Sequence, residues 1–375
     1  MNKSEFEIKV VLAIRSLDIG GAERQFIELV KHIDKNKFDV TVCTMYGGVQ
    51  EDIVKAIPNI TYYNLKKNGR YDFYGFYRRY KDLLFKLKPN VIYSFLGEMN
   101  LFSLWCKPKD AKIIWGFRAS NMDFAKYGKV PQMMFWLQKK LSCKVDKIIS
   151  NSYASVEFHK KEGFCMEKSV VVHNGIDTNR FKKDEKKRKE FREKYNLNES
   201  DIAIGMVARI DYMKGYTIFA KSAKRLLKKY ENVKFFSIGD GDGNIKKECE
   251  KILGEYNNTR FIWLGMQKNV ENFYSGFDIA SSSSFGEGFS NSIAEAMSCS
   301  VPCVVTDVGD SRIIVGDCGK VVIPNSVDEF SKGLEELMQK DLKKLGECSR
   351  KRIVENFSIE KMVKKTEKEI LKCVE

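Results

Sequence analysis

Two successive series of short apolar segments run along the chain, and most of these segments are followed by a segment with helical periodicity. The first series begins with IKVVLAI at residues 8–14, and hydrophobic residues then recur at helical spacing from Phe26 to Ile33. A parallel sheet covered on both faces requires this alternation, because each parallel connection needs a crossover helix. The further strands predicted in this series are residues 38–44, 59–64, 90–95, 111–117, 144–151 and 168–174.

A second series starts after the mixed-charge stretch KKDEKKRKEFREK at residues 182–194, which has no apolar face before Phe191. This interruption indicates a junction between two doubly wound α/β domains with a cleft between them. We expect an N-terminal domain at residues 1–175, a C-terminal domain at residues 176–356, and a last amphipathic, lysine-rich helix at about residues 357–375. The strands predicted in the second series are residues 201–208, 232–239, 259–265, 278–284, 301–306 and 319–323.

The charge balance favours an anionic partner. Lys and Arg number 65 against 50 Asp and Glu, for a net charge of +15 in 375 residues. Nucleic acid, an anionic membrane surface and a phosphorylated small molecule all fit this sign, and so does a solvated basic surface without a partner. The sequence gives no specific support for nucleic-acid binding, because it has no zinc-ligand spacing, no RNP-like aromatic motif and no helix-turn-helix pattern.

The cysteines and histidines give no support for a metal site or for Cys/His catalysis. Ten cysteines are scattered without paired spacing, and three histidines are equally dispersed, so we expect reduced and mostly buried thiols. No apolar run approaches the roughly 18 residues that span a bilayer, and the start MNKSEFEIKV lacks a signal-peptide core. We therefore expect a cytoplasmic protein.

Gly20 and Gly21 stand after the first predicted strand and before a helix. A diglycine at this place lets backbone N–H groups approach a phosphate at the positively polarised helix N-terminus. A simple tight turn explains it equally well, because GGAE is not the G-x-G-x-x-G dinucleotide fingerprint.

Arg209 and Lys214 follow the strand that opens the second series. Doubly wound folds bind ligands at the strand ends that face the cleft, and two cations at this spacing can grip adjacent phosphates, Arg by a bidentate fork and Lys as a point charge. Two ordinary surface cations are the alternative.

The most specific block is SSSSFGEGFSNSIAEAMSCSVP at residues 281–302. Seven residues separate Glu287 from Glu295, glycines flank the first acid, and a predicted helix carries the second. The glycines allow a sharp turn that presents Glu287 in the cleft. Carboxylates accept hydrogen bonds from vicinal hydroxyls, so the pair suits a sugar and a ribose, although Glu295 alone would read as a solvent-facing helix residue.

Two glycine-containing segments are less specific. IGDGDG at residues 238–243 follows a strand and is expected to be a simple connection more often than a ligand contact. HNGID at residues 173–177 lies where the domains join, where Asn and Gly tolerate the left-handed backbone of a hinge.

Four features, in their order along the chain, resemble those of glycosyltransferase family 4, retaining nucleotide-sugar transferases of the GT-B fold. They are GGAER, NGID, Arg209 with Lys214, and the Glu287–Glu295 block. The resemblance spans nearly the whole chain. It implies two doubly wound, Rossmann-like domains facing a central cleft, with the acceptor bound by the N-terminal domain, the nucleotide sugar by the C-terminal domain, and the last helix crossing back onto the first domain.

The resemblance also implies roles for individual residues. Arg209 and Lys214 would neutralise the donor diphosphate, with Gly20 and Gly21 facing it from the other domain. Glu287 would hold hydroxyls of the donor sugar and Glu295 the ribose. The amides that would contact the sugar and the phosphate are those of Gly288, Phe289, Ser290 and Asn291.

Three positions depart from the family pattern. Arg118 replaces a histidine that usually follows the fifth strand; it can donate hydrogen bonds to hydroxyls or phosphate but cannot act as a neutral acid or base. We count it with Glu287, Arg209 and Lys214 as a catalytic candidate. Ser290 stands where proline is common and Ser300 where glycine is common. These departures bear on the donor sugar and leave the fold unaffected.

The resemblance predicts a hexosyltransferase that moves a sugar from a nucleotide diphosphate, expected to be UDP, to a hydroxyl of a glycan or polyprenyl-diphosphate-linked acceptor, without cofactor or metal. Bacterial surface polysaccharide assembly is the expected pathway. A sugar-nucleotide epimerase and a non-catalytic nucleotide-sugar-binding protein are the alternatives on this architecture.

Residues 66–88 and 130–147 mix basic and aromatic residues within the predicted acceptor domain. Such a composition suits peripheral contact with an anionic membrane, here the inner face of the cell membrane. The alternative is equally open: helices whose aromatic side chains pack on the sheet and whose lysines face water.

Overall fold

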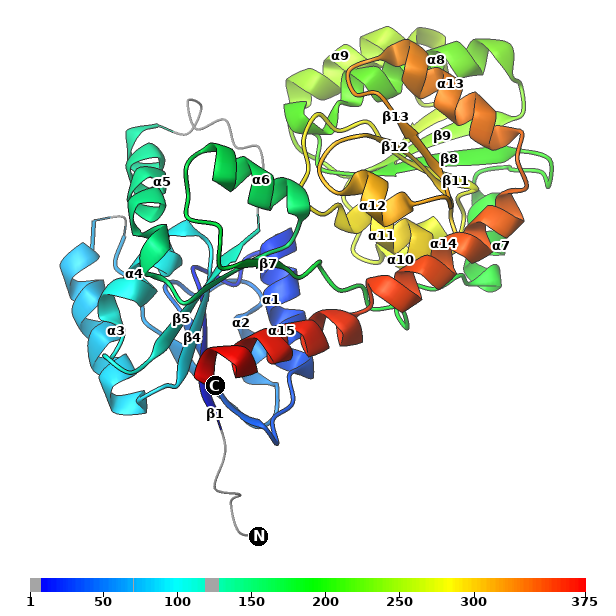
Figure 1. Cartoon of the computed structure of the whole chain (residues 1–375). Coiled ribbons are helices and arrows are strands. Elements are labelled where there is room, and N and C mark those ends of the chain that lie inside the picture. Colours follow the sequence, from blue (N-terminus) through cyan, green and yellow to red (C-terminus); the bar gives the residue numbers. More distant parts are fainter. Residues whose placement is uncertain (1–7, 70, 119–127) are drawn as a thin grey trace. The chain divides into compact units, whose positions relative to one another are not determined.

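The structure is a computed structural model, and it describes residues 8–69, 71–118 and 128–375. The chain forms two compact units: unit 1 comprises Met1–Gly175 and Ile359–Glu375, and unit 2 comprises Ile176–Ser358. Each unit contains one parallel sheet with helices on both faces (Figure 1). The two Rossmann-like sheets confirm the predicted α/β class.

The sheet of unit 1 has seven parallel strands in the order β3-β2-β1-β4-β5-β6-β7. In β1, Val10 and Leu12 belong to one core cluster while Val11 and Ala13 belong to another, because successive side chains point to opposite faces. Both faces are therefore buried, which explains the unbroken apolar run. The strands are β1 (Ile8–Ile14), β2 (Phe38–Thr44), β3 (Ile60–Asn64), β4 (Val91–Phe95), β5 (Lys112–Phe117), β6 (Lys147–Ser150) and β7 (Ser169–Val171).

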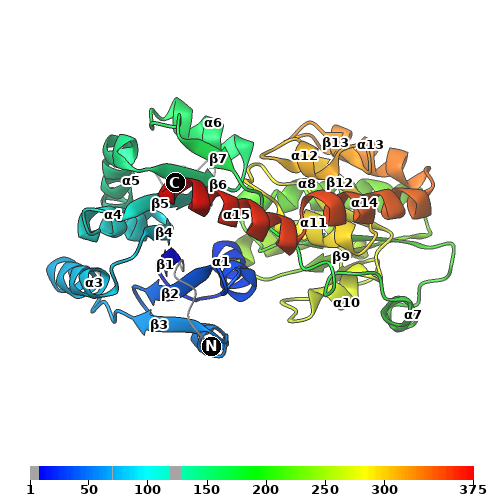
Figure 2. The same ribbon diagram turned by 60° about the horizontal axis from the view of Figure 1, so that its bottom comes forward.

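Helices cover the two faces of this sheet in separate groups (Figure 2). Phe26 of α1 and Met362 of α15 pack into one core cluster, and Phe76 of α3 and Met134 of α5 into the other. The helices of unit 1 are α1 (Gly21–His32), α2 (Glu51–Lys55), α3 (Phe73–Leu87), α4 (Gly97–Cys106), α5 (Lys129–Leu141), α6 (Tyr153–Lys161) and α15 (Ile359–Val374).

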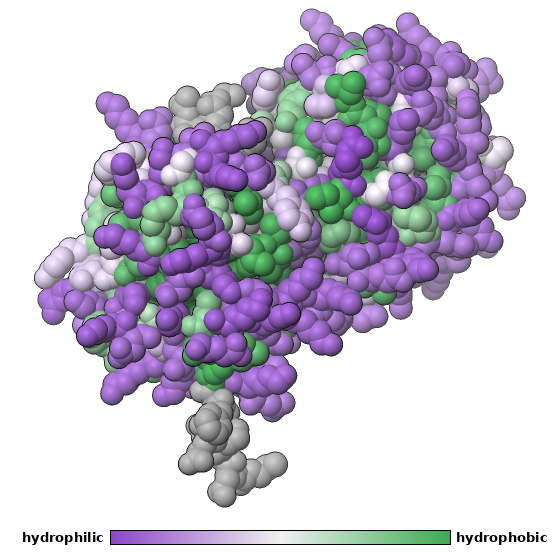
Figure 3. Space-filling model, viewed as in Figure 1, coloured by the Kyte–Doolittle hydropathy of each residue, from purple (hydrophilic) through white to green (hydrophobic). Residues whose placement is uncertain are grey.

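The last helix, α15, packs beside α1 in unit 1, although more than three hundred residues separate them in sequence. Its apolar residues Met362, Val363 and Ile370 are buried, and Lys364 and Lys368 are exposed. The molecular face drawn in Figure 3 is mostly hydrophilic.

The sheet of unit 2 has six parallel strands in the order β10-β9-β8-β11-β12-β13. Its strands are β8 (Ile202–Val207), β9 (Val233–Ile238), β10 (Phe261–Trp263), β11 (Ile279–Ser282), β12 (Cys303–Thr306) and β13 (Lys320–Val322). Its helices are α7 (Glu185–Lys194), α8 (Tyr216–Lys229), α9 (Gly243–Leu253), α10 (Val270–Tyr274), α11 (Asn291–Ser298), α12 (Ser311–Val315), α13 (Val327–Met338) and α14 (Leu342–Asn356).

The mixed-charge stretch that interrupts the two series is an ordered part of unit 2. It forms α7, whose Arg188 and Arg192 bind the two carboxylate oxygens of Asp278 at 2.6 and 3.2 Å. Asp278 also accepts a hydrogen bond from the backbone of Ala203 at 2.8 Å. The charges that resemble a linker in sequence therefore anchor this helix to the starts of β8 and β11.

Unit 1 ends at Gly175, within the HNGID segment. The left-handed backbone expected there is wrong, because neither Asn174 nor Gly175 has a positive φ. Gly175 is required for space instead: a Cβ atom at this position would lie 2.7 Å from the Cα of Ile359 on α15. The side chain of Gln25 on α1 also bonds both the N–H and the carbonyl of Gly175, at 2.8 and 2.9 Å.

Four cysteines differ from the expectation of reduced thiols. Cys143 is paired with Cys165 and Cys318 with Cys348 as disulfides, whereas Cys43, Cys106, Cys249, Cys299 and Cys303 are buried and free. The paired residues are 22 and 30 positions apart. Only the packing of distant segments brings them together, which sequence spacing does not show.

No helix in residues 8–69, 71–118 and 128–375 combines the length and hydrophobicity needed to cross a bilayer. The aromatic residues of α3 and α5 divide between the two alternatives left open by the sequence. Phe76 and Tyr80 of α3 are buried, whereas Tyr74 and Phe85 of α3 and Trp136 of α5 are at least half exposed. Arg70, which belongs to the same basic stretch, lies outside the described residues.

Candidate active site

The candidate donor site of unit 2 lies where the strand order of its sheet changes direction. β8 and β11 are neighbours, but the chain continues outward from β8 through β9 and from β11 through β12. In open α/β sheets, ligands bind beyond the carboxyl ends of two such strands. Arg209 and Lys214 follow β8, and Glu287 follows β11, so three predicted site residues come from the two strand ends that this rule selects.

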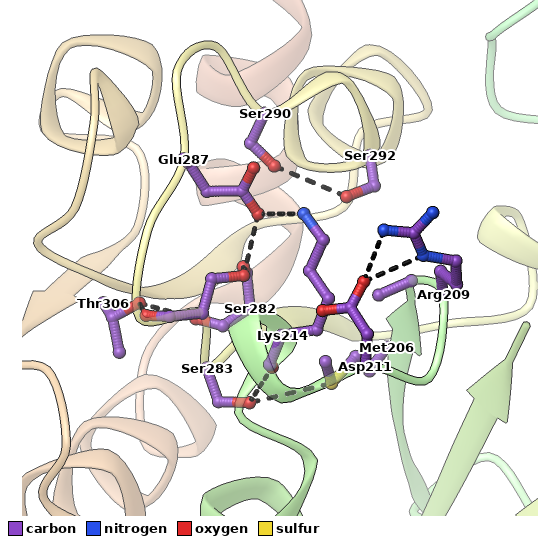
Figure 4. A network of polar contacts seen from close by, with 12 residues as sticks. Met206, Arg209, Asp211, Lys214, Ser282, Ser283, Glu287, Ser290, Ser292 and Thr306 are labelled. Atoms are coloured by element: carbon purple, nitrogen blue, oxygen red, sulfur yellow. Dashed lines mark hydrogen bonds and ion pairs between the residues drawn. The ribbon is translucent and has the colours of Figure 1, made fainter. Parts of the chain in front are cut away.

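Lys214 and Glu287 bind each other. Lys214 ends a short 3-10 turn, and its Nζ lies 2.6 Å from Glu287 Oε1 (Figure 4). Ser284 Oγ donates to the same carboxylate oxygen at 2.7 Å. The side chains of Lys214 and Glu287 are 26% and 11% exposed, so this ion pair is largely removed from water. The residue predicted to bind phosphate, Lys214, and the residue predicted to bind the sugar, Glu287, are therefore within hydrogen-bond distance of each other.

Glycines allow the loops that carry this pair to pack closely. Gly215 has φ of 63°, and a Cβ atom there would lie 2.0 Å from the carbonyl oxygen of Ser283. Phe285 N–H donates to the Met213 carbonyl at 2.8 Å, which joins the loop after β8 to the loop after β11. Gly309 is equally constrained, because its Cβ would lie 2.4 Å from the Glu287 carbonyl oxygen. The position of Glu287 thus depends on backbone contacts that only glycine permits.

Arg209 is held by Asp211, a residue that the sequence reasoning missed. The Nε of Arg209 donates to Asp211 Oδ2 at 2.8 Å, while the arginine side chain stays 76% exposed. Within the part of the chain that the structure describes, the other oxygen, Asp211 Oδ1, is buried without a hydrogen-bond partner. The sequence signal that could have identified Asp211 is its position, two residues after an arginine predicted to bind phosphate.

The IGDGDG turn supports the Arg209 segment by backbone pairing. Ile210 N–H donates to the Asp240 carbonyl at 3.0 Å, and Asp242 N–H donates to the Ile210 carbonyl at 2.8 Å. A Cβ at Gly239 would lie 1.9 Å from the Ala208 carbonyl oxygen. This turn is therefore more than a connection, because it positions the backbone on both sides of Arg209.

Glu295 lies inside unit 2 on α11 and is only 3% exposed. Tyr274 of α10 donates its hydroxyl hydrogen to Glu295 Oε2 at 3.3 Å. The solvent-facing alternative for this residue is therefore wrong. A carboxylate buried this deeply, with a phenol beside it, is suited to accepting hydrogen bonds from a ligand that enters the same space.

The backbone predicted to contact sugar and phosphate forms the start of α11. Gly288 and Phe289 precede Ser290, the N-cap residue, and the helix begins at Asn291. Ser290 Oγ lies 3.4 Å from Ser292 Oγ, and Asp310 N–H donates to the Gly288 carbonyl at 2.9 Å. The N-terminus of an eight-residue helix directed at the Glu287 loop adds a positive partial charge to this site.

Gly20 and Gly21 lie at the start of α1 in unit 1. Gly20 has an extended backbone that any residue adopts, and a Cβ there would lie 2.1 Å from Glu23 Oε2, the end of a flexible side chain that can turn aside. Burial raises the pKa of Glu23, and the negative charge of Asp18 acts in the same direction. The Glu23 carboxylate therefore occupies the space beside Gly20, where the sequence predicts a phosphate.

Arg118 follows β5 in unit 1 and is fixed by three neighbours. Its Nη2 donates to the Tyr93 hydroxyl at 2.8 Å, its Nη1 donates to Asn174 Oδ1 at 3.3 Å, and its guanidinium lies 4.4 Å from the centre of the Phe95 ring. Its Nε is buried and, among the described residues, has no hydrogen-bond partner. The structure places Arg118 in unit 1 and the other three catalytic candidates in unit 2.

Unit 1 also contains a cavity of about 780 Å³ that the sequence reasoning did not find. It lies at the point where the order of the first sheet reverses, since its walls include Arg15 after β1, Glu98 after β4 and Arg118 after β5. Met134 and Phe135 of α5 and His159 of α6 form its apolar side. Strand order decides which loops meet, and a single sequence does not reveal it.

No group of three or more His, Cys, Asp or Glu residues in the described part of the chain is arranged to hold a metal ion. The charges of this site form two ion pairs, Lys214 with Glu287 and Arg209 with Asp211. This set, with helix N–H groups, is suited to binding a phosphorylated ligand that carries hydroxyl groups.

Two family models match the chain in succession. The model described as Glycosyltransferase Family 4 matches residues 19–180, and the model described as Glycosyl transferases group 1 matches residues 187–356. Their boundary lies close to the division at Gly175, and Arg209, Lys214, Glu287 and Glu295 all lie within the second match.

Similar proteins and structures cover most of the chain. An N-acetylgalactosamine-N,N'-diacetylbacillosaminyl-diphospho-undecaprenol 4-alpha-N-acetylgalactosaminyltransferase of Campylobacter jejuni is 23% identical over 347 residues, 89% of this chain and 91% of that protein. An uncharacterised glycosyltransferase of Methanocaldococcus jannaschii is 24% identical over 67% of this chain, and the match spans 64% of its length. The crystal structure of Anabaena HepE in complex with UDP superposes with a TM-score of 0.81 at 17% identity, covering 97% of this chain and 100% of that one.

Proposed function

The chain belongs to glycosyltransferase family 4, with the GT-B fold, and we propose that it transfers a sugar from a UDP-sugar to a hydroxyl group of a lipid-linked glycan, with retention at the anomeric carbon. The observation that carries this proposal is the position of Lys214, Glu287 and the α11 N-terminus at the strand ends where the second sheet reverses. A cation and a carboxylate in contact suit a ligand with phosphate and hydroxyl groups side by side.

Lys214 and Arg209 would meet the negative charge of the leaving diphosphate. Electrostatic groups that are already oriented stabilise charge that develops during bond breaking, and in a site removed from water they act strongly. Lys214, 26% exposed and fixed by Glu287, meets this requirement. Arg209 is exposed and held by Asp211, so it would act as a second donor from the solvent side.

Glu295 and Tyr274 would bind the ribose of the nucleotide. A carboxylate accepts hydrogen bonds from two vicinal hydroxyls, and the Tyr274 hydroxyl already orients one of its oxygens. The UDP named in the HepE structure makes uracil the first base to test.

In the proposed reaction, the bond between the anomeric carbon and the diphosphate oxygen breaks, and its electron pair stays with the diphosphate. The acceptor oxygen forms a new bond to the same carbon on the same face, and its proton passes to the leaving diphosphate. Glu287 would position sugar hydroxyls, with its Oε1 held by Lys214 and Ser284.

A lipid-linked acceptor is supported by the Campylobacter relative, whose name specifies a diphospho-undecaprenol substrate. The surface of unit 1 supports it as well: Met133 and Trp136 on α5 are exposed, and Lys140 lies 6.0 Å from the Trp136 ring. Aromatic residues with lysines beside them are typical of contact with an anionic membrane interface. Surface polysaccharide assembly is the pathway that fits such an acceptor.

The proposal is tested by incubating the protein with radiolabelled UDP-sugars and bacterial membranes and analysing the products. Labelled lipid-linked glycan is expected, with the same anomeric configuration as in the donor. Free epimerised UDP-sugar would instead show an epimerase, and binding without any product would show a nucleotide-sugar-binding protein. Liposome flotation with and without anionic lipid tests the membrane contact, which should weaken as salt is raised.

A further inference from the structure

Asp211 contacts both cations of the candidate donor site. Its carboxylate binds Arg209, and its backbone carbonyl accepts a hydrogen bond from the Lys214 N–H at 3.2 Å. Asp211 is also the N-cap residue of the short 3-10 turn Tyr212–Lys214, where its own backbone is extended. The residue therefore lies between the two groups that are expected to meet the diphosphate.

The backbone just before Asp211 is fixed by the turn that follows β9. Ile210 forms an isolated bridge with Gly241, and a Cβ atom at Gly241 would lie 2.2 Å from the Ile210 carbonyl oxygen. The N–H groups of Ile210 and Asp242 complete this pairing, as described above. The Asp211 carboxylate therefore extends from a backbone that has little freedom to move.

One edge of the Arg209 guanidinium is used by Asp211. Nε and Nη2 of Arg209 both lie 2.8 Å from Asp211 Oδ2 (Figure 4). A guanidinium has five N–H donors, so this contact leaves the edge formed by Nη1 and Nη2 available to a ligand. The arginine side chain is 76% exposed. A phosphate can bind that edge through two parallel hydrogen bonds.

The second oxygen of the Asp211 carboxylate distinguishes this pair from an ordinary surface pair. The Asp211 side chain is 24% exposed, and among the described residues its Oδ1 is buried without a hydrogen-bond partner. In the Arg225–Asp328 pair of the same unit, by contrast, the aspartate is 81% exposed. A buried acceptor without a partner reduces stability. Stability therefore does not account for the position of this carboxylate, whereas a role toward Arg209 does.

We propose that Asp211 is a positioning residue of the donor site, which holds Arg209 so that its Nη1/Nη2 edge is presented to the diphosphate before the ligand binds. This inference rests on the proposed donor site and adds the residue that orients its exposed cation. An exposed arginine has many side-chain conformations, and fixing it only when the ligand arrives lowers the affinity. Asp211 reduces this loss, because it restricts Arg209 in the free protein.

The Asp211 carboxylate has a second effect of opposite sign, since a negative charge beside the site repels an anionic ligand. A double-mutant cycle separates the two effects. The repulsion acts with or without Arg209, whereas positioning requires Arg209. The experiment therefore compares wild type with Asp211→Ala, Arg209→Ala and the double variant.

Calorimetry measures the affinity of each protein for UDP, inorganic pyrophosphate and uridine at about 0.15 M salt. Uridine has no phosphate, so its affinity reports changes of the site that do not involve the diphosphate. The matched control is Asp328→Ala, which removes the carboxylate of the exposed Arg225–Asp328 pair. Thermal melting establishes that each variant is folded.

Asp211→Ala should bind UDP and pyrophosphate about 3 to 10 times more weakly than wild type, because Arg209 is then ordered only on binding. Its affinity for uridine should be unchanged, and Asp328→Ala should match wild type throughout. In the Arg209→Ala background, removal of Asp211 should cause no further loss, because the cation that it positions is missing. Asp211→Glu keeps the charge but adds a methylene group, so it should also weaken UDP binding.

Three results would overturn the inference: wild type binds neither UDP nor pyrophosphate, Asp211→Ala binds both as well as wild type or better, or Asp211→Ala weakens binding equally with and without Arg209. The last result would mean that Asp211 maintains the fold of the site and does not act through Arg209. A failure of the proposed function is recognised separately, as the absence of labelled product from a wild-type protein that binds UDP.

Discussion

Lys214 Nζ lies 2.6 Å from Glu287 Oε1, so the cation expected to face the diphosphate and the carboxylate expected to hold the donor sugar are bound to each other. Neither is free to move without the other, because Ser284 also fixes the carboxylate and Gly215 fixes the turn before α8. A substitution of Lys214 should therefore change both catalysis and stability, and a double variant with Glu287 is needed to separate the two effects.

Lys214→Ala should lower sugar transfer about a hundredfold, which corresponds to about 3 kcal/mol of lost transition-state stabilisation. It should also reduce the free energy of unfolding of unit 2 by about 1–3 kcal/mol, because Glu287 would remain buried without its cation. The double variant Lys214→Ala/Glu287→Gln should regain stability but not transfer. Lys221→Ala, an exposed lysine on α8, is the control. Recovery of transfer in the double variant would show that Lys214 has only a structural role.

Arg209→Ala should reduce transfer at least about tenfold while leaving the melting temperature unchanged, because its side chain is 76% exposed and its ion pair with Asp211 contributes little to stability. Steady-state kinetics with saturating acceptor measure the effect. Arg225→Ala is a matched control, since Arg225 is an exposed arginine paired with Asp328 in the same unit. Equal rates for the two variants would remove Arg209 from the donor site.

His159 should make unit 1 sensitive to acid. Burial lowers its pKa from 6.5 to about 4, so the unfolded chain binds a proton more readily than the folded one. Its contribution to stability is therefore complete above pH 6.5 and decreases as the pH falls toward 4. Between pH 7 and pH 5 the loss should be about 2 kcal/mol.

Urea unfolding at these two pH values measures the loss in wild type and in His159→Gln, which has no group that titrates in this range. The variant should lose about 2 kcal/mol less than wild type over the same interval. Identical pH dependence in the two proteins would show that His159 is protonated in the folded state at pH 5.

Ser300 has φ of 61°, the left-handed region that glycine adopts readily, and it follows α11. Ser300→Gly should therefore stabilise unit 2 by about 1 kcal/mol and raise its melting temperature by about 2–4 °C. Differential scanning calorimetry checks this. A lower melting temperature would mean that the Ser300 side chain makes a contact worth more than the backbone strain.

The strands of both units were predictable because residues buried on both faces of a parallel sheet form unbroken apolar runs, as in IKVVLAI and FDVTVCT. Arg209, Lys214 and Glu287 were predictable as a group for a related reason. Each follows the carboxyl end of a strand, and the carboxyl ends of parallel strands lie at one edge of the sheet.

Features that depend on contacts between distant segments were not predictable. The stretch from Lys182 to Lys194 resembles a linker until Asp278 is known to bind its arginines. The cavity at Glu98 forms because β4 lies beside β1, and the spacing of residues along the sequence does not show that these two strands pair. Gly175 was expected to supply a left-handed turn, but its constraint comes from Ile359 on the last helix.

The central claim, that unit 2 binds the nucleotide of a UDP-sugar, is tested most directly by titrating UDP into wild type, Glu295→Gln and the control Glu347→Gln, which changes an exposed acid on α14. Wild type and the control should bind UDP equally, and Glu295→Gln should bind about tenfold more weakly, since a charged acceptor for ribose hydroxyls is lost. If UDP binds to none of the three proteins, or binds equally to all of them, the account of this site is wrong.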